Sequence, residues 1–407
     1  MPTLQIASYD LAIDLTGGPD TFWSRTEIRF GCSAPGVSAA ADVYALNIRQ
    51  AVLNGADLQD AAASDGGLQL VRLDGDNTLI VEAEFAYAPS GAVGLMRETG
   101  PDGSSYVYSK TYPGGAPHIF CCFDQPDLRA PFTLSIRAPI GWSCLANASL
   151  ADRLPDKTTA LWTFAVTRSI APYLFSICTG LSAGPAFACE RRDGSPLAVT
   201  THALPPVAEL LDAALSAEVF QQPLLYYERM LGVRYPDDKY DVAFLPRFAA
   251  LAFGAPGLLT IRDEVLNLKD KPEAYLAAVI AHELAHAWFG GLIEFQPLED
   301  EWLEEAITTY VSRSALEARH PDVTPWSADT SRTLPDHAYA KYAAPLKQLE
   351  TMIGKQAVMD GLGDLLRHHP NRTVTKDDLA RSWSLASGHD LREWAANQLI
   401  PVPPDEA

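Results

Sequence analysis

Two histidines and two glutamates form the group with the clearest chemistry in this sequence. His282 and His286 stand four residues apart, Glu283 follows the first histidine, and Glu305 lies further along the chain. Residues four apart on a helix share one face, so both imidazoles can bind a single metal ion. With Glu305 as third ligand a fourth position stays open, which distinguishes a catalytic zinc ion from a structural one. Glu283 can then take a proton from metal-bound water, so the spacing predicts one catalytic Zn²⁺ per chain.

An apolar helix is expected to position this group. Residues 275–281 are all apolar. Pro272 and Glu273 suit the first turn of a helix, and Gly290 suits its end. Charged groups on a buried helix need a partner, and a metal ion supplies one. The alternative, an amphipathic helix with two incidental histidines, is disfavoured by this flanking pattern.

The apolar pattern changes character near the middle of the chain. Up to about residue 185, short alternating or apolar runs such as 132–137 are broken by Gly, Pro and Asp clusters, which is typical of strands. Beyond that point the period is helical, in 207–231 and again in 376–399. The sequence therefore predicts an α+β fold, with a β-rich domain (1–185) followed by a mostly helical domain (186–407).

Composition limits the possible partners and location. The chain has 407 residues, is 47% hydrophobic and carries a formal charge of −20, which argues against nucleic acid or anionic membrane as partners. No run approaches the eighteen or so apolar residues of a membrane span, and the N-terminus lacks the pattern of a signal peptide. The six cysteines include the neighbours Cys121 and Cys122 and show no paired CxxC spacing. They are interpreted as reduced core residues of a cytoplasmic protein.

The sequence around the histidines resembles the aminopeptidase N family of zinc metallopeptidases, the M1 gluzincins. Residues 282–290 read HELAHAWFG where the family has HELAHxWFG. Residues 302–306 read WLEEA where the family has WLNEG, after the same gap. Three further segments resemble family segments in the family's order: residues 9–15 its opening strand, 120–130 its FPCFDEPxxKA segment and 339–343 its YxKGA helix.

The resemblance implies a thermolysin-like, mostly helical zinc metallopeptidase domain, with the same zinc ligands and general base as the spacing predicts. It also implies that Tyr339 donates a hydrogen bond to the developing oxyanion, and that Asp300 supports the ligands from behind. The gap from Glu305 to Tyr339 is shorter than in the family, and Tyr342 stands at the family's glycine. Large members continue into a helical C-terminal domain that this short form is expected to lack, which would leave the site more open or covered by a partner chain.

Two segments depart from the family at the positions that recognise a free α-amine. The family's GAMEN strand becomes LAFGA, so that Ala252, Phe253 and Gly254 are expected to contact substrate, with Gly254 in place of the glutamate. At a second acidic site, Lys110 and Tyr112 replace the family's glutamine and glutamate. An ammonium group beside Lys110 would be repelled. We therefore expect altered recognition of the substrate amine, for an N-acylated, carboxylate-bearing or specialised small substrate.

Four functions stay open at this stage. The first is a zinc hydrolase that cleaves an amide or peptide bond in a small peptide or amide-containing small molecule, with altered amine recognition. The second is a conventional aminopeptidase in which the acidic group has moved elsewhere in the pocket. The third is a hydrolase of a non-amide bond, since the family includes a leukotriene epoxide hydrolase. The fourth, a non-catalytic binding protein, is disfavoured by the intact chemical group. The sequence does not indicate the oligomeric state.

Overall fold

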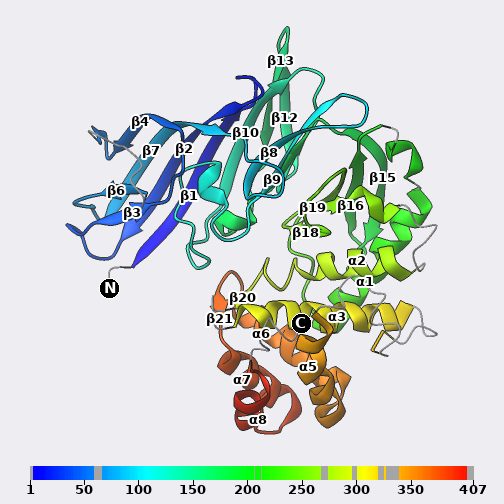
Figure 1. Cartoon of the computed structure of the whole chain (residues 1–407). Helices are drawn as coiled ribbons and strands as arrows, with labels where there is room; N and C mark the ends of the chain where they lie inside the picture. Colours follow the sequence, from blue (N-terminus) through cyan, green and yellow to red (C-terminus); the bar gives the residue numbers. More distant parts are fainter. Residues whose placement is uncertain are drawn as a thin grey trace. The chain divides into compact units, whose positions relative to one another are not determined.

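The chain divides into two compact units, each described here by itself (Figure 1). The first comprises Met1–Ala183 with Ala255–Leu258, and the second comprises Gly184–Gly254 with Leu259–Ala407. The predicted domain boundary at residue 185 lies next to this division. The computed structural model describes residues 3–58, 67–205, 207–211, 213–266, 274–295, 300–319, 325–326 and 339–400.

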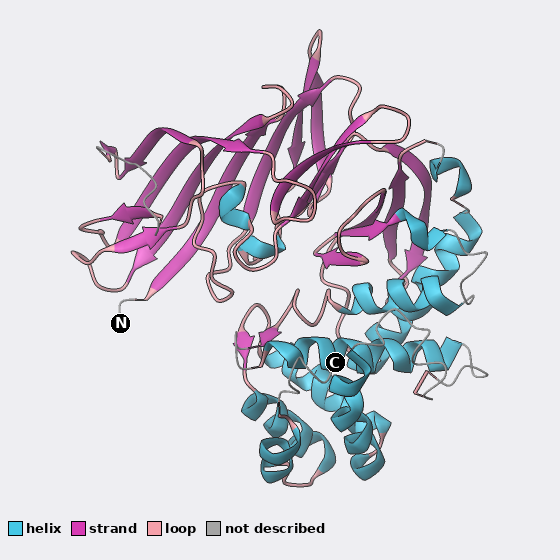
Figure 2. Cartoon of the chain, viewed as in Figure 1, coloured by secondary structure: helices cyan, strands magenta, loops and turns pink. Residues whose placement is uncertain are grey.

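The first unit is built on a large, mainly antiparallel sheet. Its eight strands run in the order β12-β13-β10-β1-β2-β7-β4-β5, and β1 pairs with β10 in parallel. A four-stranded sheet, β11-β14-β9-β8, and the pair β3-β6 complete it (Figure 2). The strands are β1 Leu4–Asp14, β2 Thr21–Cys32, β3 Ala39–Ala41, β4 Asn47–Leu53, β5 Ala56–Asp57, β6 Leu68–Leu70, β7 Asp76–Ala86, β8 Gly94–Thr99, β9 Ser105–Lys110, β10 Phe132–Pro139, β11 Cys144–Ala146, β12 Leu150–Pro155, β13 Thr159–Phe164 and β14 Ile177–Thr179.

Alternation of side chains explains why these segments form a sheet with one buried face. Along β2, every second residue is buried, beginning with Phe22. The same period recurs along β7 and β10, because successive side chains of a strand point to opposite faces. The predicted strand at 132–137 is confirmed as β10. Two short 3₁₀ turns, η1 Ala116–His118 and η2 Pro172–Leu174, also belong to this unit.

The segment that resembles FPCFDEPxxKA lies in the core of the first unit. Phe123 donates its backbone N–H to the buried hydroxyl of Tyr9 at 3.1 Å. Cys122 forms an isolated β-bridge with Asp42. All six cysteines of the chain are buried, which confirms their predicted place in the core, and none is paired in a disulfide.

The second unit combines a five-stranded sheet with packed helices. The sheet runs β15-β16-β17-β19-β18, so β18 forms one edge. Helices α1, α2 and α3 pack against one another, and α5 packs on α3. The elements are β15 Ser182–Glu190, β16 Pro196–Ala203, η3 Val207–Leu210, α1 Ala213–Leu231, β17 Lys239–Leu245, β18 Ala252–Ala255, β19 Leu258–Arg262, η4 Asp263–Leu266, α2 Ala274–Ala285, β20 Glu294–Phe295, α3 Glu301–Arg319, α5 Ala340–Ile353, α6 Lys355–His368, β21 Thr373–Val374, α7 Lys376–Ser387 and α8 Arg392–Gln398.

The helical predictions hold with local changes. The stretch 207–231 is a 3₁₀ turn followed by α1, and 376–399 is divided into α7 and α8. Gly388 separates the latter two, because its left-handed backbone (φ 74°) ends α7. The helix start predicted at Pro272 lies outside the described residues. No helix in the described part of the chain is long and apolar enough to cross a membrane. The α+β fold, with a β-rich part followed by a mostly helical one, is confirmed.

Candidate active site

Helix α2 holds the first histidine in a buried position. The helix is apolar on all sides up to Ala281, and a helix of this kind is stable only when it is covered on every face. The hydroxyl group of Tyr227 in α1 donates a hydrogen bond to the Ala281 carbonyl at 2.7 Å, which connects α1 to α2. His282 is 6% exposed, so its imidazole is directed into the protein rather than into solvent.

The helix ends earlier than its sequence predicts. α2 stops at Ala285, so His286 lies in the tight turn that follows and not on the helix itself. In this turn the backbone N–H of Trp288 donates a hydrogen bond to the carbonyl of Ala285 at 3.0 Å. A bond to the residue three positions earlier is typical of a tightened last turn. Gly290 then reverses the chain with φ at 100°, and a Cβ atom there would collide with the side chain of Glu304.

Helix α3 brings the predicted third ligand to the two histidines. Glu305 Oε2 lies 3.3 Å from Nε2 of His282, and Oε1 lies 3.8 Å from Nε2 of His286. One donor atom from each of the three residues lies within 4.8 Å of the others. Two imidazole nitrogens and one carboxylate oxygen are a donor set that zinc accepts, with a further position left for another ligand. The residues present therefore fit a catalytic zinc ion.

The charges around this cluster favour a cation. Burial alone would lower the pKa of His286, but Glu305, Glu304 and Glu283 together raise it to about 10. Burial would raise the pKa of Glu305, yet His286 and His282 lower it below its ordinary value. The carboxylates thus hold a positive charge among them. A metal ion can replace protons in such a cluster, because its ligands must be deprotonated to bind it.

The orientation of His286 is set by its other ring nitrogen. Nδ1 lies 3.1 Å from the carbonyl oxygen of Phe289, which can only accept, so Nδ1 carries the hydrogen. The carboxylate of Glu304 lies 3.6 Å from the same nitrogen. This arrangement directs Nε2 toward Glu305. Sequence reasoning named neither Phe289 nor Glu304, because the carbonyl contact depends on the tight turn after α2 and not on residue type.

Glu283 lies beside the cluster, against the edge strand β18. Burial raises the pKa of its carboxyl group, and the neighbouring His282 and His286 offset part of this effect. The backbone N–H of Gly254 donates a hydrogen bond to the carboxylate. A carboxylate whose pKa is raised accepts a proton more readily at neutral pH, which is the property that a general base needs.

Tyr339 stands immediately before α5, with its ring over the first histidine. The ring centroids of Tyr339 and His282 are 6.0 Å apart, and the planes are nearly parallel at 11°. The negative charge of Glu305, followed by burial and by Glu283, raises the pKa of Tyr339 to about 12. The phenol therefore keeps its proton at neutral pH and can donate it in a hydrogen bond.

Two models of one peptidase family match large parts of this chain. Residues 215–334 match the peptidase family M1 domain, and residues 7–174 match the peptidase M1 N-terminal domain. The chain belongs to peptidase family M1. Aminopeptidase N of Streptomyces lividans is 31% identical over 96% of this chain and 50% of its own length. Aminopeptidase 2 of Candida albicans (24% identical) aligns with 97% of this chain and 47% of its own length, and leucyl aminopeptidase of Saccharolobus solfataricus (24% identical) with 86% and 48%. The chain spans about half the length of these relatives.

The M1 resemblance also predicted a supporting role for Asp300. Asp300 is 5% exposed, and its carboxylate accepts a long hydrogen bond from the backbone N–H of Lys376 at 3.4 Å. Nδ1 of His282 is buried and makes no hydrogen bond to the described residues. Asp300 thus connects the start of α3 to the start of α7, and its support of a zinc ligand stays a prediction.

The residues predicted to contact substrate in this M1 chain belong to both units. In the second unit, Phe253 of β18 is buried and Ala252 is half-buried. A Cβ atom on Gly254 would lie 2.7 Å from the Glu283 carbonyl oxygen, so the strand passes too close to α2 for any side chain there. In the first unit, the Lys110 ammonium donates to the carbonyl of Gly91 at 3.2 Å.

Tyr112 completes the set in the first unit. The Lys110 ammonium lies 5.4 Å from the centroid of the Tyr112 ring, within the range of a cation–π contact. The two residues that replace the family's polar pair therefore contact each other. Their role in substrate binding stays a prediction.

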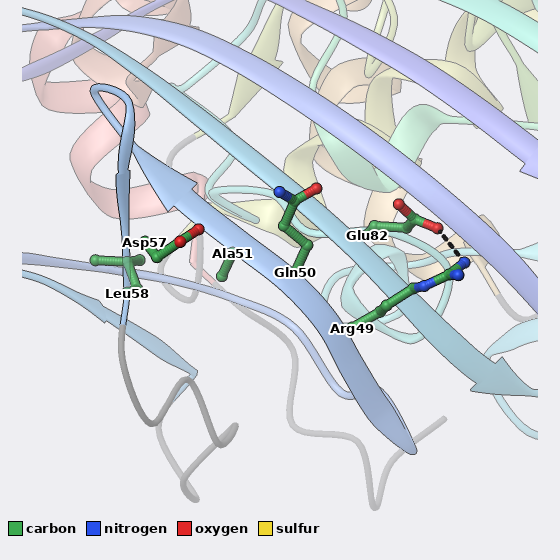
Figure 3. A pocket seen from close by; sticks show the side chains of 6 residues that line it. All are labelled: Arg49, Gln50, Ala51, Asp57, Leu58 and Glu82. Atoms are coloured by element: carbon green, nitrogen blue, oxygen red, sulfur yellow. Dashed lines mark hydrogen bonds and ion pairs between the residues drawn. The ribbon is translucent and has the colours of Figure 1, made fainter.

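A separate hollow lies at the β4–β5 end of the first unit's large sheet (Figure 3). Its volume is about 400 Å³, and an ion pair between Arg49 and Glu82 at 3.0 Å forms one side. The other lining residues are Gln50, Ala51, Asp57 and Leu58. None of the predicted site residues lies there, and Arg49 and Glu82 pair with each other.

Proposed function

We propose that this M1 chain is a zinc-dependent hydrolase that cleaves an amide or peptide bond, with one Zn²⁺ bound by His282, His286 and Glu305. The observation that carries the proposal is the convergence of these three donors within 4.8 Å, with Glu283 beside them. The ion would act as a Lewis acid, polarising a carbonyl and lowering the pKa of water.

The chain's own residues supply proton transfer and orientation. Glu283, with its raised pKa, takes a proton from the attacking water and passes it to the leaving nitrogen. Gly254 holds that carboxylate through its backbone N–H. Tyr339 keeps its phenolic proton and donates a hydrogen bond to the oxygen that becomes negative during attack.

For the substrate, we propose a small peptide or amide-containing molecule whose end near Lys110 is N-acylated, neutral or anionic. Support comes from Gly254, where a side chain would collide with the backbone of Glu283. A carboxylate at this position for binding a free α-amine would require strand β18 or Glu283 to shift. The alternative is a conventional aminopeptidase, which the names of the relatives favour. A cytoplasmic location remains our expectation from the free cysteines.

Two measurements test the proposal. Elemental analysis of the purified protein should give one zinc per chain, and His286→Ala should remove most of it; unchanged zinc in the variant would refute the ligand assignment. The second measurement compares kcat/KM for amide reporters that differ only in N-acetylation of the same amino acid. A strong preference for the free amine would restore the conventional aminopeptidase.

A further inference from the structure

The ring of Tyr342 packs against the proposed oxyanion donor. Tyr339 precedes α5 and makes no side-chain capping hydrogen bond, so the helix by itself does not fix its ring. Tyr342 follows three residues later, on the same side of the helix. The two ring centroids are 6.1 Å apart with an angle of 27° between the planes, an offset-stacked arrangement.

Tyr342 is in turn held from two directions. Trp302 of α3 meets it edge to face, with centroids 6.2 Å apart and planes at 60°. The Lys341 ammonium lies 5.3 Å from the centroid of the Tyr342 ring. Tyr342 is half-buried and packs against the core of the second unit, so its ring has little freedom to move.

These contacts connect the two predicted zinc ligands His282 and Glu305 through a chain of aromatic side chains. His282 stacks on Tyr339, Tyr339 stacks on Tyr342, and Tyr342 meets Trp302. Trp302 stands three residues before Glu305 on α3, so both lie on one side of that helix. Glu305 returns to His282 at 3.3 Å. Tyr342 thus contacts Trp302 on α3, the helix that carries Glu305, and it also contacts Tyr339. Tyr339 in turn stacks on His282.

We propose that Tyr342 is a positioning residue, which holds the ring of Tyr339 against His282 so that its hydroxyl meets the developing oxyanion. The inference rests on the proposed function, because that function gives Tyr339 its role as hydrogen-bond donor. A ring at this position performs a task that the glycine of the resembling YxKGA pattern has no side chain to perform.

The experiment uses the full chain loaded with zinc, and alanine and N-acetyl-alanine methylcoumarin amides as reporters. Tyr342→Ala removes the ring, Tyr342→Leu keeps much of its volume without a flat face, and Tyr342→Phe keeps the ring without the hydroxyl. Each change is also made in a Tyr339→Phe background. Zinc content and the thermal midpoint are measured for every variant, and crystal structures of Tyr342→Ala and Tyr342→Leu report the position of the Tyr339 ring.

We expect Tyr342→Ala and Tyr342→Leu to lower kcat about tenfold to a hundredfold, because displacement of a catalytic group by about 1 Å has effects of this size. KM and zinc content should change little, and Tyr342→Phe should behave as wild type. In the Tyr339→Phe background, removal of the Tyr342 ring should have no further effect on kcat.

Other outcomes overturn either this inference or the proposed function, and they are distinguishable. If Tyr339→Phe lowers kcat but Tyr342→Ala and Tyr342→Leu do not, or if the effects multiply in the double variants, Tyr342 does not act through Tyr339. A change confined to KM would make Tyr342 a substrate-contacting residue. If Tyr339→Phe has no effect, its role in the proposed function is wrong. The crystal structures then still test the positioning, and an unmoved Tyr339 ring would refute it.

Discussion

The backbone of Gly254 lies directly against Glu283, so that a methyl group on Gly254 would come within 2.7 Å of the Glu283 carbonyl oxygen and 3.0 Å of its carboxylate. Strand β18 therefore supports the proposed general base at the position where the GAMEN pattern has a glutamate. In a Gly254→Glu variant, the new side chain would displace strand β18 or Glu283. The variant would therefore disturb the proposed base even if its new carboxylate could bind an amine.

Gly254→Ala should lower kcat at least about tenfold, because the added methyl group must displace either the strand or Glu283. Overpacking of this kind also costs about 1–3 kcal/mol of stability. Steady-state kinetics and chemical denaturation measure the two effects. Gly31→Ala in β2 is the matched control, since its Cβ atom would meet nothing closer than 3.6 Å. Equal kinetics for the two variants would contradict the proposed support of Glu283.

Glu283→Gln should keep zinc and fold but lose about a hundredfold to ten-thousandfold in kcat, the usual size of general acid–base assistance. The amide has nearly the same shape but accepts no proton at neutral pH. Zinc analysis and kcat on the best reporter are the measurements. Glu264→Gln, at an exposed position, serves as control. Activity within about twofold of wild type would exclude Glu283 as the base.

Under the proposed function, Lys110→Gln should raise the ratio of kcat/KM for a free-amine reporter to that for its N-acetylated counterpart, because it removes a positive charge that would repel an ammonium group. A charge-assisted contact changes binding by about 1.5–3 kcal/mol, so the ratio should move by roughly tenfold or more. Lys157→Gln, in the exposed turn between β12 and β13, controls for net charge. If both substitutions leave the ratio unchanged, Lys110 does not face the substrate.

Asp124 makes stability depend on pH in a defined direction. Burial raises its pKa to about 6; the N–H of Gly114 opposes this and the charge of Asp42 adds to it. Because the folded pKa exceeds the unfolded value, the protonated group favours folding below about pH 4, and this stability is lost as pH rises through 6. Asp124→Asn should therefore stabilise the protein at pH 7–8 by about 1–3 kcal/mol and give no gain near pH 4.

Chemical denaturation at several pH values measures this effect, with the exposed Asp127→Asn as control from the same segment. Asparagine keeps an oxygen that can accept from Gly114, whose N–H lies 2.8 Å from the aspartate. A destabilised variant at pH 8 would mean that the charge of Asp124 is compensated in the folded protein.

The sequence was informative where the chemistry depends on local spacing. The shared side of His282 and His286 could be predicted because the spacing of two residues four apart is a short-range property, whereas Glu305 of α3 was assigned from the motif as a whole. The strand β10 and the helix α7 followed equally from their periods. Such patterns show which face of a segment is buried. They can be read from the segment itself, without knowing which other elements pack against it.

Contacts between distant segments could not be predicted in this way. The support of Glu283 by Gly254 requires β18 to pass within contact distance of α2, which no periodicity encodes. The tight turn that places His286 beyond the helix depends partly on Gly290, whose missing side chain leaves room for Glu304. Both features depend on the close approach of segments that are distant in sequence. The sequence shows that a glycine is present at each position but not what lies against it.

The short parallel pair β20–β21 joins Glu294 and Phe295 to Thr373 and Val374. The loop that it closes contains Glu305 and Tyr339. Chains emerge from the ribosome N-terminus first, so β20 has no partner until Thr373 and Val374 have been made. Closing a loop of this length carries an entropic cost before its contacts form. We therefore expect the metal centre to reach its final geometry, and zinc loading to be completed, only after β21 has been made and has paired with β20.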